Sequence, residues 1–189
     1  MHAPNIPQIR LYQNWLRNHR GLSFDSYDAL WRWSVTDLDA FWQSLWDCEE
    51  MDSPTPHSAV LAVDRMPGAV WFPGAQVNFA QRVLRHASAA HAAGMPAIVS
   101  DDELSLVRET SWPELARQVA SFALRLRELG VQRGDRVAAC LPNVPETVVA
   151  FLGCCSIGAV WSVCAGQSEM GFLAVIGRAS CRERVFRVV

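Results

Sequence analysis

Residues 111–165 read SWPELARQVASFALRLRELGVQRGDRVAACLPNVPETVVAFLGCCSIGAVWSVCA, and this stretch decides the fold. Ser111 and Glu114 have the spacing of a helix capping box ahead of an apolar run. Gly130 stands where the end of a helix favours a left-handed residue. Between these signals, apolar residues recur with helical spacing, which predicts a buried helix face made of Leu115, Val119, Phe122, Ala123 and Leu126.

Two short apolar runs flank a second predicted helix. Arg136–Leu141 and Ala159–Cys164 are typical of buried strands. Between them, the segment Asn143–Ile157 is predicted to be a helix that Asn143 caps, with Pro145 in its first turn. Strand, helix and strand with short links predict a right-handed crossover between parallel strands. Leu141 and Val163 are expected to be buried, and the helix is expected to turn Val148, Val149, Leu152 and Cys155 inward.

Three amphipathic helices are predicted in the first 50 residues. The first includes Ile9 and stops near Gly21, the second lies at about Tyr27–Trp33, and the third begins after Thr36-Asp37. Five of the eight tryptophans fall in this region. Helical spacing favours packing of these helices on a larger body over a ligand-binding aromatic box. The apolar stripe of the third helix consists of Leu38, Phe41, Trp42, Leu45 and Trp46.

The middle of the chain has a less regular pattern. Asp52–His57 is a polar, proline-bearing linker, and Met66–Ala75 is predicted to be a loop or an irregular strand. Asn78 can cap a further helix. Ala97–Ser100 and Leu104–Thr110 are predicted to be strands on either side of a polar turn.

Residues with chemical potential are few. The acidic turn Asp101–Glu103 could bind a metal ion, although three consecutive carboxylates at a loop tip usually face water. His86 and His91 are five residues apart, not the four that would align two ligands on one helix face, so solvated histidines are expected. Ser162 lies near the carboxyl end of a predicted parallel strand, but no histidine in the sequence pattern accompanies it. No glycine-rich phosphate loop or nucleophile elbow is present.

Composition excludes several classes of protein. The chain of 189 residues contains no lysine, so its 17 basic residues are all arginines. Four of them lie in the last fourteen residues with one acid, Glu183, which leaves 13 arginines against 18 acids up to Val175 and argues against nucleic-acid binding. We find no signal peptide and no apolar run that would span a bilayer. The six cysteines lack the spacing of metal ligands or of a disulfide framework, which favours a reduced, cytoplasmic compartment.

Several segments, in order along the chain, resemble one enzyme family. Residues 27–37 (YDALWRWSVTD) with Phe41-Trp42 are similar to the N-terminal region of acetyl- and acetoacetyl-CoA synthetases. Residues 71–80 (WFPGAQVNFA) resemble the acetoacetyl form of a motif of that family. Residues 111–115 (SWPEL) are similar to the first core motif of adenylate-forming enzymes. The strand–helix–strand predicted after this motif also resembles that of the family, through residues 134–137 (GDRV), 141–143 (LPN) and 158–162 (GAVWS).

The resemblance implies a large two-domain ligase that uses ATP and Mg²⁺ to convert a carboxylic acid into an acyl-adenylate and then transfers the acyl group to coenzyme A. The implied fold class is α/β: a partial N-terminal domain of an adenylate-forming enzyme, with a helical N-terminal arm followed by strand–helix–strand units of a mainly parallel sheet. The implied regions are 1–57, a tryptophan-rich helical region; 58–175, a truncated start of the AMP-binding domain; and 176–189.

The family's phosphate loop, adenine-pocket segment and lysine-bearing C-terminal domain have no counterpart in this sequence. We therefore assign no catalytic, cofactor-binding or metal-binding residue, and we expect this chain alone to be inactive and to bind neither ATP, Mg²⁺ nor coenzyme A. From about Ile176 the sequence resembles translated sequencing-adapter read-through, so residues 176–189 are expected to be a non-native tail. Two alternatives to a ligase fragment remain open: a non-catalytic module that binds a protein partner through its tryptophan-rich arm, and an unrelated small nucleotide-binding domain.

Overall fold

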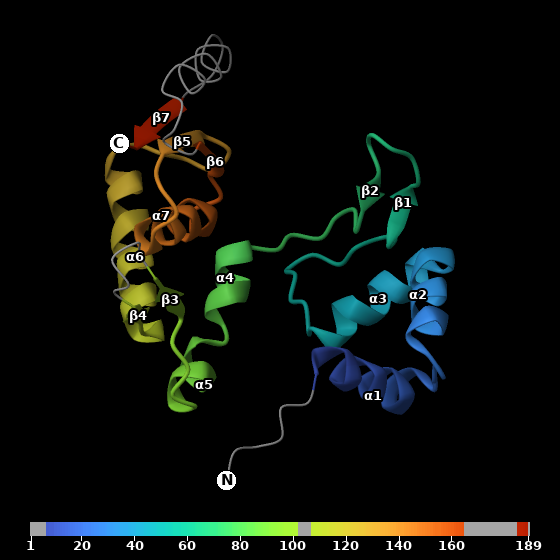
Figure 1. Ribbon diagram of the computed structural model, residues 1–189. Coiled ribbons are helices and arrows are strands. Elements are labelled where there is room, and N and C mark those ends of the chain that lie inside the picture. The colour runs from blue at the N-terminus through green and yellow to red at the C-terminus, as the bar shows by residue number, and fades with distance from the viewer. Residues whose placement is uncertain (1–6, 102–106, 165–184, 189) are drawn as a thin grey trace. The chain divides into compact units, whose positions relative to one another are not determined.

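The computed structural model describes residues 7–101, 107–164 and 185–188, which form two compact units (Figure 1). The first unit extends to Val77 and the second begins at Asn78. The predicted division after residue 57 concerns family regions and stays a prediction. Residues 58–77 share a unit with the N-terminal helices because they pack against them, as described below. Each unit is described by itself.

Three helices form the first part of the N-terminal unit: α1 (Gln8–Arg20), α2 (Tyr27–Thr36) and α3 (Leu38–Cys48). α1 ends at Gly21, whose φ of 66° is left-handed, as predicted. The side chain of Ser26 caps α2 by accepting from the Ala29 N–H at 3.1 Å. Asp37 caps α3 by accepting from Ala40 N–H at 3.1 Å, so the predicted start of the third helix is confirmed.

The apolar stripe of α3 is a packing surface. The Phe41 ring meets Tyr12 of α1 edge-on at a centroid distance of 6.4 Å and Trp33 of α2 at 5.6 Å. Trp42 lies 5.5 Å from Trp71 in the same way. Aromatic pairs at such distances and angles contribute about 0.5–1.5 kcal/mol beyond the area they bury. The stripe therefore packs against side chains of its own unit, and its packing on a larger body stays a prediction.

A small hairpin completes this unit. β1 (Leu61–Val63) pairs antiparallel with β2 (Val70–Trp71), and Leu61 lies opposite Trp71. β2 falls within the stretch predicted to be loop or irregular strand. β1 has no counterpart in the sequence prediction, because three residues are too few for a period of two to be recognised.

The second unit contains a parallel sheet with helices beside it (Figure 1). Asn78 caps α4 as predicted, by accepting from Gln81 N–H at 3.1 Å. β3 and β4 pair antiparallel, as the sequence predicted for the segments around the acidic turn. The elements in chain order are α4 (Phe79–Leu84), α5 (Ala87–Ala92), β3 (Ile98–Ser100), β4 (Arg108–Thr110), α6 (Trp112–Glu128), β5 (Arg136–Cys140), α7 (Pro145–Ser156), β6 (Val160–Cys164) and β7 (Val185–Val188).

The sheet has the order β6-β5-β7. β5 and β6 are parallel, in register from Arg136 opposite Val160 to Cys140 opposite Cys164, so the predicted parallel pairing of two strands joined by α7 is confirmed. β7 is also parallel to β5, with Arg136 opposite Val185. This third strand lies in the arginine-rich C-terminal residues, where the sequence shows no strand period, and it was not predicted.

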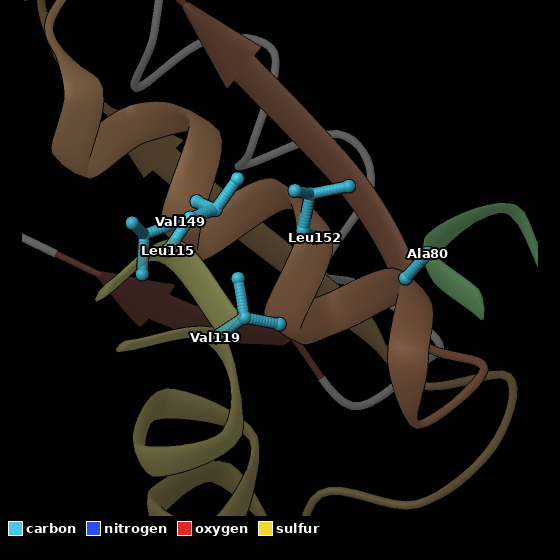
Figure 2. Close-up of a cluster of buried hydrophobic side chains, with 5 residues drawn as sticks. All are labelled: Ala80, Leu115, Val119, Val149 and Leu152. Atoms are coloured by element: carbon cyan, nitrogen blue, oxygen red, sulfur yellow. The ribbon is translucent and has the colours of Figure 1, made fainter. Parts of the chain in front are cut away.

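The core of the second unit lies between α4, α6 and α7. Figure 2 shows one cluster of buried side chains from these helices: Ala80, Leu115, Val119, Val149 and Leu152. A second cluster joins the end of α6 to the sheet and consists of Leu126, Val131, Val137, Cys154 and Ala159. The predicted inner face of α6 is confirmed, since four of its five residues are buried and Phe122 packs against both clusters.

Two burial predictions are wrong. Val163 is 44% exposed, and Leu141 is only half-buried. β5 has a strand on each side and its central residues are buried, whereas β6 is an edge strand among the described residues. Leu141 follows the last residue of β5, where the chain leaves the sheet. No helix of the described ranges is long and apolar enough to cross a membrane.

Candidate functional site

Ligands of open α/β sheets bind beyond the carboxyl ends of the strands. In this chain that place is the loop between β5 and α7, which runs from Leu141 to Val144. Thr147 fastens it by donating its hydroxyl hydrogen to the carbonyl of Pro142 at 2.7 Å.

The predicted cap of α7 at Asn143 is wrong. Val144 is the N-cap, and no side chain caps the helix there. The reason is Pro145, which occupies the first helical position and forces the residue before it into an extended conformation. Val144 accordingly has φ −128° and ψ 161°. The first turn of α7 carries Glu146, whose negative charge is favourable at a helix N-terminus. The Oε1 of Glu146 lies 3.8 Å from the Nη2 of Arg108.

A hollow beside this loop is too small for a nucleotide. It has a volume of about 160 Å³ and is lined by Ile98–Asp101 of the β3 end together with Asn143, Val144, Pro145 and Val148. Pockets for drug-sized ligands usually measure about 300–1,000 Å³. Within this lining the Ser100 hydroxyl donates to the Arg108 carbonyl at 3.3 Å.

The other candidate site residues from the sequence do not come together into one site in the described part of the chain. Ser162 is exposed in β6 opposite Ala138, and no hydrogen bond joins it to a histidine in the described ranges. His86 and His91 are exposed, as predicted. Of the acidic turn only Asp101 lies within the described residues. Across residues 7–101, 107–164 and 185–188, no three His, Cys, Asp or Glu side chains are grouped so that they could hold a metal ion.

The cysteine pair of α7 serves packing. Cys154 is fully buried in the second core cluster, and Cys155 packs at the margin of the first. Burial, together with the neighbouring Cys155, raises the pKa of the Cys154 thiol to about 12. Because the thiolate is the reactive form, Cys154 is an inert thiol at neutral pH.

Two segments of the first unit, residues 53–58 and 71–75, are joined by close contacts and hydrogen bonds. Gly74 has a φ of 92°, and a Cβ there would stand 2.9 Å from the Pro56 carbonyl oxygen. Thr55 donates its hydroxyl hydrogen to the Gly74 carbonyl, and the Ser58 N–H bonds to Pro73 O at 3.0 Å. The WFPGA sequence at residues 71–75 therefore forms a turn that clasps the linker at residues 53–58.

The same motif contributes Phe72 to an aromatic cluster with Trp46 of α3 and His57 of the linker. The Trp46 and Phe72 ring centroids are 4.7 Å apart, and the His57 ring lies 5.0 Å from Trp46 and 5.1 Å from Phe72. Phe72 has a positive φ of 44°, which is uncommon for a bulky residue and persists where surrounding contacts fix it. No sequence pattern marks His57, because its partners lie on other elements.

Asn78 joins two helices of the second unit. While its oxygen caps α4, its amide nitrogen donates to the carbonyls of Cys155 at 2.9 Å and Ser156 at 3.3 Å, at the end of α7. These carbonyls belong to the last turn of the helix, where partners within the helix run out. The Asn78 side chain thus provides hydrogen-bond partners for backbone groups at the start of α4 and at the end of α7.

Taken together, these features define a class: a chain with one unit built on a parallel α/β sheet and another that is helical and rich in tryptophan. The chain belongs to the AMP-binding enzyme family, whose model matches residues 84–185. A second model, described as the acetyl-coenzyme A synthetase N-terminus, matches residues 27–83. The two matches meet close to the boundary between the structural units.

Similar proteins are much longer than this chain. The acetoacetyl-coenzyme A synthetase of Rhizobium meliloti (strain 1021) is 35% identical over 166 residues, which are 87% of this chain and 25% of the relative. The acetoacetyl-CoA synthetase of Xenopus tropicalis is 34% identical over 182 residues, 94% of this chain and 26% of the relative. The solved acetoacetyl-CoA synthetase from Streptomyces lividans superposes with a TM-score of 0.81 and 40% identity over 95% of this chain and 28% of its own. The chain thus spans about a quarter of the length of these relatives.

Proposed function

We propose that this chain is the amino-terminal part of an ATP-dependent acid–thiol ligase whose acid is acetoacetate. The observation that carries the proposal is the likeness to the Streptomyces lividans enzyme, at 40% identity over nearly the whole chain. The order of the two family models supports it, since the synthetase N-terminus precedes the AMP-binding region. No observation favours a partner-binding module, because the aromatic stripe of α3 packs on its own unit.

The chemistry has two balanced steps. The carboxylate of the acid attacks the α-phosphorus of ATP, forming the acyl-adenylate and releasing pyrophosphate. The thiol of coenzyme A then attacks the acyl carbonyl, losing its proton, and AMP leaves to give the thioester. Charge that develops in the first step must be stabilised by positioned cations and backbone donors.

This chain does not provide those groups. It contains no lysine, and Arg133 and Arg136 lie at the amino-terminal end of β5, opposite to the edge where ligands bind. The described residues contain no group of side chains that could hold Mg²⁺, and we propose no catalytic, cofactor-binding or metal-binding residue within this chain. ATP, Mg²⁺ and coenzyme A belong to the longer enzyme, which we place in the cytoplasm. We also retain the proposal that residues 176–189 are a non-native tail.

Acetoacetate-dependent ATP–pyrophosphate exchange tests this function. We expect no exchange from the 189 residues, because losing even one such stabilising donor typically costs about 10²–10³ in rate. ATP with Mg²⁺ should likewise give no protection against heat. A chain extended with the missing C-terminal motifs should show exchange with acetoacetate and less with acetate. Exchange by the 189 residues alone would mean that the active site is misplaced, and an inactive extended chain would refute the ligase.

A further inference from the structure

His57 sits at the end of a chain of hydrogen bonds that begins on α1. Its Nε2 lies 2.8 Å from the Oε1 of Gln43 on α3. The Nε2 of Gln43 donates to the Oδ1 of Asp47 at 3.0 Å, one turn further along the same helix. The other carboxylate oxygen of Asp47 accepts from the guanidinium of Arg20. We call these four residues the amide relay.

The direction of every bond in the relay follows from Asp47. A carboxylate that pairs with a guanidinium is ionised and can only accept hydrogen bonds. Gln43 must therefore turn its NH₂ group toward Asp47, which leaves its carbonyl oxygen facing His57. An amide oxygen carries no hydrogen, so the hydrogen between Gln43 and His57 must belong to His57 Nε2.

We propose that Asp47, acting through Gln43, is a positioning residue that holds neutral His57 in the Nε2–H tautomer and leaves Nδ1 as its acceptor nitrogen. In the described part of the chain, no hydrogen bond reaches Nδ1. The relay thereby sets where His57 can accept a proton or a hydrogen bond. Functional histidines are held in one tautomer in the same way, by the hydrogen bond that one ring nitrogen makes.

The relay also connects parts of the unit that are distant in sequence. Arg20 belongs to α1, Gln43 and Asp47 to α3, and His57 to the linker clasped by the WFPGA turn. Because His57 contacts Trp46 and Phe72 as well, a change of its tautomer would alter the edge that it presents to the aromatic cluster. The device is conformational and does not depend on the ligase activity.

Nitrogen NMR can read the tautomer directly. The 189-residue chain would be labelled with ¹⁵N-histidine and studied dilute at pH 8, and His57 would be assigned by the loss of its signals in His57→Gln. We expect a pyrrole-type Nε2 and a pyridine-type Nδ1, with a directly bonded Nε2 proton that exchanges slowly with water. A pyrrole-type Nδ1 would overturn the proposal.

Two variants test the role of the relay itself. Asp47→Asn has nearly the same shape but can donate as well as accept, so the Gln43 amide can turn over. Gln43→Leu removes the relay link. In each variant we expect the slow Nε2 proton to be lost and a measurable share of the Nδ1–H form to appear. Arg20→Met is the control, since Asp47 can still orient Gln43 and the His57 spectrum should stay unchanged. An unchanged His57 spectrum in Asp47→Asn would refute the positioning role, even if Gln43→Leu failed to fold.

Discussion

The ring of Phe122 in α6 lies directly against Gly153 of α7. A Cβ at residue 153 would stand 2.7 Å from the Phe122 Cδ1, closer than carbon atoms approach without a shift. Phe122 packs against both core clusters, so its ring has little room to move. The absence of a side chain at residue 153 therefore sets how closely α6 and α7 approach.

Gly153→Ala should destabilise the second unit by about 1–3 kcal/mol, the usual cost of overpacking. Helix propensity acts in the opposite direction, since alanine is favoured over glycine by about 1 kcal/mol inside a helix. Thermal unfolding followed by circular dichroism would measure the sum. In a Phe122→Leu background the same substitution should be neutral or stabilising, and a full loss of stability in that background would contradict the contact.

Gly74→Ala should destabilise the first unit by more than the cost of placing alanine in the left-handed conformation of residue 74. A left-handed conformation costs a residue with a side chain about 1–2 kcal/mol, and here the Cβ would also press on the Pro56 carbonyl. Gly68→Ala is the matched control: its φ is 104°, in the same unit, and its nearest neighbour is the Arg65 side chain at 3.5 Å. Equal losses of stability in the two variants would show that the clasp has no energetic role.

Asn78→Ala should cost about 2 kcal/mol, because it removes a helix cap worth about 1 kcal/mol and hydrogen bonds worth about 1 kcal/mol to the end of α7. Asn78→Asp separates the two roles. It keeps the oxygen that caps α4 but places a carboxylate against the carbonyls of Cys155 and Ser156. Unfolding in urea should show that the aspartate variant does not recover wild-type stability. Full recovery would mean that only the cap matters.

The folded chain should lose stability at alkaline pH because the unfolded chain ionises Cys154 more readily. Its folded pKa of about 12 lies above the ordinary value of 9.0, so the unfolded chain loses this proton first as pH rises. The neutral Cys154 thiol makes its full contribution to the free energy of unfolding below pH 9, and this contribution declines between about pH 9 and 12. We expect the melting temperature of the wild type to drop more steeply over this range than that of Cys154→Ala. Parallel curves would refute the assignment.

The outer edge of β6 should make the 189-residue chain prone to associate at raised concentration. Val160 is 50% exposed and Val163 44%, on a strand with one partner among the described residues. Purified protein should bind a hydrophobic dye and aggregate with time. A lysine at an exposed strand edge discourages pairing, so Val163→Lys should slow aggregation more than Val35→Lys, which replaces a residue 49% exposed on a helix. A sharply melting, soluble monomer would contradict this expectation.

Features that depend on neighbours in the chain could be predicted from the sequence. The buried face of α6 follows from side chains that recur each helical turn, and the caps at Asp37 and Asn78 bond to backbone only three residues away. The parallel pairing of β5 with β6 follows from a crossover whose length and handedness leave few alternatives. The ordered family segments likewise are read residue by residue, and the family models confirm them.

The remaining features needed the tertiary structure, because their partners are distant in sequence. The Asn78 amide reaches a carbonyl 77 residues away, and β7 finds β5 across a long connection. Val163 has the sequence of a buried strand residue, yet its exposure depends on what lies beside β6, which no local pattern records. His57 bonds to Gln43, and Gln43 bonds to Asp47, both on α3, so no local pattern around residue 57 records these partners. Local periodicity specifies which face of an element is apolar, and only the packed chain determines what that face and its polar groups meet.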